Sequence, residues 1–102
     1  MAVIECSLAP DHPAAEGHFP GNPIIPGAVL LAEALHAIGS HLGVALQPCR
    51  LRSAKFPNPA RPGARLAIEY SGDARRGVRF TCTVGGSTVL SGEVQCIASS
   101  TT

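Results

Sequence analysis

Residues His18 to Gly27 read HFPGNPIIPG, and the chain runs from them directly into AVLLAEAL at positions 28–35. The first stretch holds three prolines, at positions 20, 23 and 26. Each proline fixes its own φ and keeps the residue before it extended. We therefore expect a stiff, ordered loop that ends where a helix begins.

The helix after Gly27 is the only convincing helix in the sequence. Its apolar residues recur at steps of four, three and four, which predicts one buried stripe made of Leu31, Leu35, Ile38 and Leu42. Gly43 is a plausible C-terminal stop. About 15 residues at 1.5 Å each give a helix of roughly 22 Å, long enough to cross a small sheet.

The remaining segments read as strands joined by turns. Alternating apolar and polar residues predict strands near 2–8, 49–56, 66–70, 78–84 and 88–96, with Gly85-Gly86-Ser87 joining the last two as a hairpin. One helix among about five antiparallel strands is an α+β layout, in which the sheet wraps around the helix. At 102 residues, the chain is expected to be a single domain over 1–102.

The composition is that of a folded globular protein, with 45% apolar residues, 15% charged residues and a net charge of +1. No apolar run approaches the roughly 20 residues that span a bilayer, and aromatic and basic residues do not interleave as in proteins that bind single-stranded nucleic acid. We expect a soluble cytoplasmic protein, because no export signal is visible and no CxxC spacing occurs. The expected state is four reduced, mostly buried thiols at Cys6, Cys49, Cys82 and Cys96.

Candidate chemistry gathers around His18 and the start of the helix. The first-turn amides near Gly27 and Ala28 are unpaired donors at the positive end of the helix dipole, suited to a carbonyl that gains negative charge. A histidine can take a proton from the carbon next to that carbonyl. This pairing indicates proton abstraction α to a thioester, whereas a lone turn histidine is more often bonded to backbone.

HFPGNPIIPG followed by AVLLAEAL resembles the active-site turn and central helix of the hotdog-fold 3-hydroxyacyl-acyl-carrier-protein dehydratases. FPNPARPGARL, from Phe56 to Leu66, resembles the proline-glycine turn of the same family. The short length looks closer to the small dehydratase-like proteins of aryl polyene and related pigment pathways. The resemblance implies a hotdog fold that eliminates water from a 3-hydroxyacyl thioester, giving a trans-2-enoyl product. It implies His18 as base and substrate contacts from Phe19, Pro26, Gly27 and Ala28.

The family's acid does not align simply with this sequence. The family places an Asp or Glu five residues after the glycine of the PG pair, where this chain has Ala32, and Glu33 follows one residue later. One residue rotates a helical side chain by about 100°, so Glu33 is a provisional catalytic acid only. Glu33, His36 and Ser40 also fit a solvated polar face or a subunit interface. His36 stands where the family often has glutamine, and its role stays open.

The resemblance further implies a dimer, because in the family the acid comes from the other subunit. The expected assembly is a homodimer or a larger even-numbered oligomer, with a heterodimer as an alternative. The substrate is expected on an acyl carrier protein or coenzyme A. Two other functions stay open: a non-catalytic acyl-thioester-binding or partner subunit of a dehydratase, and a hotdog thioesterase.

A basic cluster in the sequence suits an acidic carrier protein as well as it suits solvated strand faces; it comprises Arg50, Arg52, Lys55, Arg61 and Arg65. No metal or cofactor is expected. His36 and His41 lie about 140° apart around a helix, so they do not converge on an ion, and no HExxH occurs. The GGS hairpin precedes no helix, and no GxSxG is present, which excludes a phosphate loop and a serine hydrolase elbow.

Overall fold

The computed structural model describes residues 2–8, 24–44, 46, 49–73 and 75–96, and only the backbone of the last of these. The elements in chain order are β1 (Ala2–Ser7), α1 (Gly27–Leu42), β2 (Cys49–Lys55), β3 (Arg65–Asp73), β4 (Gly77–Val84) and β5 (Ser87–Cys96). The part of the predicted stiff loop that precedes Ile24, with His18 and Phe19, lies outside the described residues.

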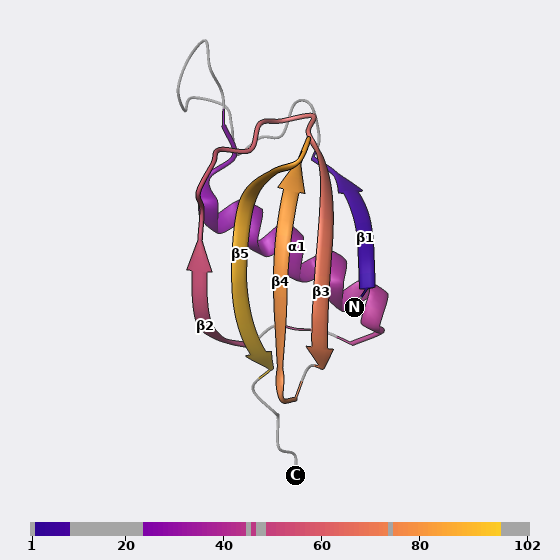
Figure 1. Ribbon diagram of the computed structural model, residues 1–102. Coiled ribbons are helices and arrows are strands. Elements are labelled where there is room, and N and C mark those ends of the chain that lie inside the picture. Colours follow the sequence, from indigo (N-terminus) through magenta and orange to yellow (C-terminus); the bar gives the residue numbers. More distant parts are fainter. Residues whose placement is uncertain (1, 9–23, 45, 47–48, 74, 97–102) are drawn as a thin grey trace.

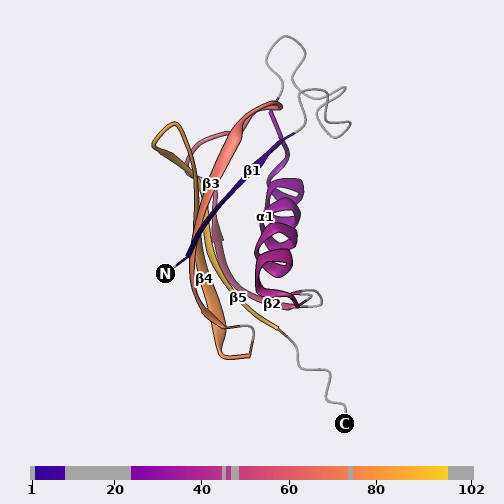
Figure 2. The ribbon, with the colours of Figure 1, turned by 90° about the vertical axis from the view of Figure 1, so that its right-hand side faces the viewer.

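The strands form one five-stranded sheet in the order β1-β3-β4-β5-β2, with every neighbouring pair antiparallel. Figure 1 shows α1 crossing diagonally behind the strands, and Figure 2 shows the sheet curving around one side of the helix. The predicted α+β layout is therefore confirmed. Because β1 and β2 are the two edges, each has one side of its backbone without a partner strand among the described residues.

The predicted hairpin between β4 and β5 is also confirmed, and its turn explains the glycine pair. Gly85 and Gly86 have φ values of 57° and 87°. Two consecutive residues with positive φ are typical of the two-residue turn whose twist matches that of the flanking strands. Glycine takes this conformation without the steric cost that a Cβ atom brings.

The core lies between the concave face of the sheet and one side of α1. The sheet contributes fully buried side chains such as Phe80 and Ile68. The helix contributes Leu30, Ala34, Leu35, Ile38 and Gly39. The predicted stripe was therefore only partly right, because Leu31 and Leu42 are half-buried and flank the buried row. The buried row that packs against the sheet contains Leu30, Ala34 and Ile38, which are spaced four residues apart. The sequence prediction did not include Ala34 because its side chain is small.

The C-terminal end of α1 is closed by two glycines. Gly43 has φ 77° and its amide donates to the Gly39 carbonyl at 2.9 Å, which confirms the predicted stop. Gly39 is buried where the chain turns back over the helix. A Cβ atom at Gly39 would lie 2.7 Å from the Val44 carbonyl oxygen and 3.5 Å from the Leu46 amide nitrogen. The return of the chain toward β2 therefore depends on the missing side chain at Gly39.

Replacing Gly39 with alanine is expected to destabilise the protein by about 1–2 kcal/mol. Overpacking a buried site typically costs about 1–3 kcal/mol, which outweighs the gain of up to about 1 kcal/mol from the better helix propensity of alanine. Urea unfolding measures the difference. Ser40→Ala, one residue along on the exposed side of α1, is the control for propensity alone. A Gly39→Ala protein as stable as the Ser40→Ala protein would contradict the expected clash.

The described cysteines confirm only part of the thiol prediction. Cys82 is a buried free thiol, and Cys6 is a half-buried free thiol. Cys49 is half-buried, and the side chain of Cys96 lies outside the described residues. Within the part of the chain that the structure describes, no helix has both the length and the apolar character needed to cross a membrane.

Candidate functional site

The start of α1 is fixed to the loop between β2 and β3. The Ile25 amide donates to the Ala60 carbonyl at 2.8 Å. Half-buried Pro26 then occupies the N-cap position with φ −57° and ψ 145°, values that a proline adopts without strain. The segment that leads from His18 is therefore held, at its C-terminal end, against the proline-glycine turn that follows β2.

The first turn of α1 presents free amide donors. The amides of Val29 and Leu30 both donate to the Pro26 carbonyl at 3.0 Å. Among the described residues, the amides of Gly27 and Ala28 have no acceptor. These two N–H groups stand at the positive end of the helix dipole, where a developing negative charge is stabilised. Ala28 is exposed and Gly27 half-buried, so an outside ligand can approach this turn.

A cavity of about 410 Å³ adjoins this helix start. Its lining is mostly apolar and comprises Ile24, Ile25, Gly27, Leu30, Phe56, Pro57, Asn58, Pro59 and Ala60. The Phe56 ring lies against Gly27, because a Cβ atom built at Gly27 would be 3.1 Å from the ring carbon Cζ. Phe56 is 44% exposed, which is unusual for so large an apolar side chain. The cavity has the size and character of a site for an alkyl chain.

Gly27 is the one lining residue that sequence reasoning assigned to the site, and Phe56 is the largest of those it did not assign. Its stretch, FPNPARPG, was noted only as a turn between strands. The feature of the sequence that could have pointed to Phe56 is its place directly before a proline-rich turn, where an aromatic ring is often exposed. Its contact with Gly27 joins residues 29 positions apart, and no local pattern predicts such a contact.

The residues that were grouped on the polar side of α1 differ in their exposure. Ala32, His36 and Ser40 are exposed, and we call this side the open face of the helix. Glu33 is half-buried on a flank of the helix. Burial raises the pKa of the Cys6 thiol, and the charge of Glu33 raises it further, so Glu33 acts on β1 of its own chain. Glu33 therefore borders the predicted polar face, about 20° around the helix from Ser40, and is less exposed than Ser40.

Removal of the Glu33 charge is expected to make Cys6 more reactive. In Glu33→Gln the pKa of Cys6 falls, so a larger fraction is thiolate at pH 8 and alkylation by iodoacetamide is faster. Peptide mass spectrometry resolves the rate at each cysteine. Cys82 is the internal control, because burial and then the nearby Cys6 raise its pKa to about 12 and keep it unreactive. An unchanged Cys6 rate would place Glu33 away from β1.

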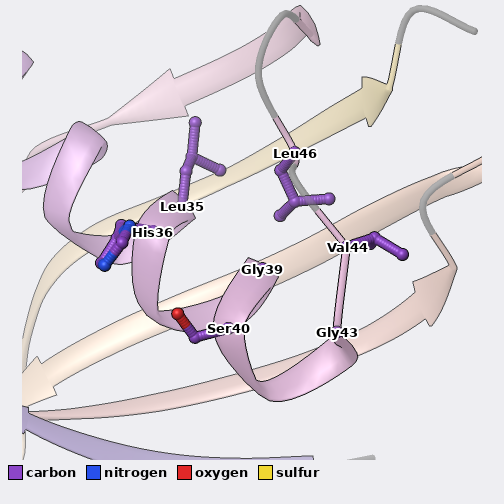
Figure 3. A pocket seen from close by; sticks show the side chains of 7 residues that line it. All are labelled: Leu35, His36, Gly39, Ser40, Gly43, Val44 and Leu46. Atoms are coloured by element: carbon purple, nitrogen blue, oxygen red, sulfur yellow. The ribbon is translucent and has the colours of Figure 1, made fainter.

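A second cavity, of about 450 Å³, lies along the C-terminal half of α1. Figure 3 shows His36 and Ser40 on the helix beside it, with Val44 and Leu46 on the segment that follows.

The His41 side chain, in contrast, is engaged within the fold. Its Nδ1 shares a hydrogen bond with the hydroxyl of buried Tyr70, and the two rings meet edge to face with their centroids 5.7 Å apart. The two histidines therefore do not converge. No group of three His, Cys, Asp or Glu side chains among the described residues could hold a metal ion.

The chain was compared with known proteins. Residues 1–93 match the family model described as ApeI-like, ApeI dehydratase. The chain is 35% identical to the 3-hydroxyacyl-[acyl-carrier-protein] dehydratase FabZ of Magnetococcus marinus, over 86% of this chain and 62% of that protein. It is 32% identical to FabZ of Chlamydia trachomatis serovar L2, over 93% of this chain and 71% of that protein.

Among solved structures, the dehydratase heterocomplex ApeI:P of Xenorhabdus doucetiae has a similar fold, with a TM-score of 0.72 and 23% identity over 93% of this chain and 86% of that one. This likeness confirms the hotdog fold that the sequence resemblance implied. The family model covers nearly all of the chain and includes the segment with His18. The chain belongs to the ApeI-like dehydratase family.

Proposed function

We propose that this protein eliminates water from a 3-hydroxyacyl thioester carried on an acyl carrier protein and releases a trans-2-enoyl thioester. The observation that carries the proposal is the pair of amides at Gly27 and Ala28, which have no acceptor among the described residues, beside a mostly apolar cavity. A thioester carbonyl at those amides would leave its acyl chain next to the cavity lined by Phe56. Both FabZ relatives are named as dehydratases of 3-hydroxyacyl carrier-protein substrates.

In the proposed mechanism His18 acts as the base and removes a proton from C2 of the substrate. The carbonyl oxygen gains negative charge, which the amides of Gly27 and Ala28 stabilise. The C2–C3 double bond then forms as the C3–O bond breaks, and an acid protonates the departing hydroxyl to give water. Phe19 is proposed as a further substrate contact. For a homomeric enzyme we propose Glu33 as the acid, since it is the only carboxylate in the sequence of α1.

A partner-dependent subunit is the second candidate function. Ala32 lies on the open face of the helix and offers no proton. The charge of Glu33 raises the pKa of the Cys6 thiol on β1. A second, non-identical chain could then supply the acid to His18. The heterocomplex of Xenorhabdus doucetiae, which has the same fold, motivates testing for such a partner.

Assembly through the β2 edge is part of the proposal. Among the described residues β2 pairs only with β5, and four consecutive residues from Arg50 to Ser53 are exposed. Leu51 shares a ladder position with buried Val94 yet is 48% exposed, so α1 leaves this part of the sheet uncovered. An edge strand with an uncovered apolar residue favours pairing with another chain. We propose a dimer or larger even-numbered oligomer, and a cytoplasmic location that keeps the thiols of Cys6 and Cys82 reduced.

The decisive experiment is an assay of the purified chain with a 3-hydroxyacyl carrier protein, read by mass spectrometry of the acyl group. A decrease of about 18 Da in the mass of the acyl group, the mass of one water molecule, supports dehydration. Release of free thiol instead would indicate a thioesterase. Native mass spectrometry of the same sample gives the assembly. Substrate binding without turnover by the isolated chain, with turnover restored by a co-purifying hotdog chain, would favour the partner-dependent subunit.

A further inference from the structure

The ladder between β2 and β5 ends in a pair of cysteines. Cys49 begins β2 and Cys96 ends β5, and the antiparallel register places the two residues directly opposite each other. Opposed residues in antiparallel strands have Cα atoms about 4.5 or 5.5 Å apart, depending on whether the pair is hydrogen-bonded. A disulfide forms across a Cα separation of about 4.4–6.8 Å. The backbone at this pair therefore suits a disulfide without a shift of either strand.

The other two cysteines are placed where they cannot take part in this pairing. Cys6 lies on β1, at the opposite edge of the sheet from β2. Cys82 lies on β4 opposite Leu90, which precedes Cys96 along β5 by roughly 20 Å at about 3.3 Å per residue. Because β3 separates β1 from β4, the Cα atoms of Cys6 and Cys82 are at least about 9 Å apart, beyond the limit of about 7 Å for a bridge. The register of the sheet therefore selects one pairing.

Side-chain hydrogen bonds fix the register next to the cysteine pair. The Arg52 guanidinium of β2 donates to Gln95 Oε1 at 3.2 Å. Gln95 Nε2 donates to the Arg75 carbonyl, in the turn after β3, at 2.9 Å. Gln95 therefore ties the end of β5 both to β2 and to that turn, one residue before Cys96. The position of Cys96 opposite β2 is held by these two contacts as well as by the ladder.

The strand ends that carry the two cysteines have little other support. The ladder between β2 and β5 is irregular between Leu51 and Ser53, and β2 is an edge strand of the described sheet. The described ladder between β4 and β5 begins at Val94, so the two residues of β5 that follow it pair with β2 alone. A covalent bond at this place would hold the end of β5 and the start of β2 together.

We propose that Cys49 and Cys96 form a redox-sensitive disulfide, with a low-molecular-weight disulfide such as glutathione disulfide as the oxidant. The thiolate of Cys49, which is half-buried on the edge strand, attacks one sulfur of glutathione disulfide, and a glutathione thiolate leaves. The thiolate of Cys96 then attacks the Cys49 sulfur of this mixed disulfide and displaces the second glutathione. The two protein thiols lose two electrons and two protons, which convert glutathione disulfide to two glutathione thiols. Excess glutathione reverses both steps.

The disulfide acts on stability and leaves the candidate site untouched. The loop that it closes contains the whole of β3 and β4. A cross-link over a long loop stabilises a protein mainly by restricting the unfolded chain. We therefore expect the oxidised protein to unfold about 10 °C above the reduced protein. Phe56 follows the other end of β2, so the bond lies a whole strand away from the helix start.

The test treats the full chain with glutathione disulfide under native conditions. The remaining thiols are then blocked with N-ethylmaleimide in denaturant, and the peptides are mapped by mass spectrometry without reduction. The expected result is one linked pair of peptides, joining Cys49 to Cys96, with Cys6 and Cys82 blocked as thiols. The same oxidation in urea is the matched control. An unfolded chain favours shorter loops, such as the one between Cys82 and Cys96, over the longer loop from Cys49.

Two variants connect the bond to stability. Cys96→Ser is expected to abolish the rise in melting temperature on oxidation, whereas Cys6→Ser, the same substitution at the other edge of the sheet, should keep it. Glutathione attached to Cys49 and Cys96 without a link between them would overturn the proposal. Links to Cys6 or Cys82 in the native protein would do the same, as would a native pattern equal to that in urea. The mapping uses the unsubstituted chain, so it decides the pairing even where a variant folds poorly.

Discussion

Replacement of His18 by alanine is expected to lower kcat/KM for dehydration by about 10²- to 10⁴-fold, the contribution typical of a positioned general base. The proton at C2 of a 3-hydroxyacyl thioester is weakly acidic, so its removal depends on both the base and the amides that stabilise the charge on the carbonyl oxygen. The amides at Gly27 and Ala28 are unchanged in His18→Ala. The substrate should therefore still bind, and the loss should fall on kcat.

Three measurements make this result specific. Thermal unfolding of His18→Ala should match the parent protein, and KM for the acyl thioester should change less than threefold, within about 0.7 kcal/mol. His18→Gln keeps hydrogen bonding but has no proton-accepting nitrogen, so it should be as inactive as His18→Ala. A glutamine variant that retains most of the activity would assign His18 a structural role in its turn and remove it from the mechanism.

The fold was predictable where the local chemistry was decisive. Gly43 after an apolar stretch, and Gly85-Gly86 between two alternating segments, each sit where positive φ is required, so the helix end and the hairpin followed from the residues themselves. The buried faces of β3 and β4 were also predictable, because successive side chains of a strand point to opposite faces of the sheet. The strand order could not be predicted in this way, because β2 pairs with β5 and β1 with β3 through contacts that no local pattern contains.

The candidate site was predictable only in part, for a related reason. The residues around Gly27 and the free amides follow from a helix that begins after a proline. The role of Phe56 depends on a distant contact, and the direction of Glu33 depends on how far α1 is rotated about its axis. That rotation is set by Leu30, Ala34 and Ile38 against the sheet, whereas the sequence pattern had favoured a stripe one residue further along. An error of one residue in the helix face changes which neighbour is the acid.

Ala32→Glu is expected to raise the activity of the isolated chain about 100-fold, because it places a carboxyl group on the open face of α1, where the family motif has its acid. The substitution adds a polar group at an exposed position, so little loss of stability is expected. Ala32→Gln, with the same shape and no acidic proton, is the matched control and should give no gain. Activity is measured with and without any co-purifying partner chain.

The same assay on Glu33→Gln locates the acid in the parent protein. If Glu33 is the acid of a homomeric enzyme, Glu33→Gln loses about 10²-fold or more and Ala32→Glu rescues the double variant. If a partner supplies the acid, Glu33→Gln changes the rate of the mixed complex little, while Ala32→Glu frees the chain from its partner. For a partner-dependent subunit, in which the exposed Ala32 offers no proton, we expect the second pattern. A large loss in Glu33→Gln with no gain in Ala32→Glu would refute it.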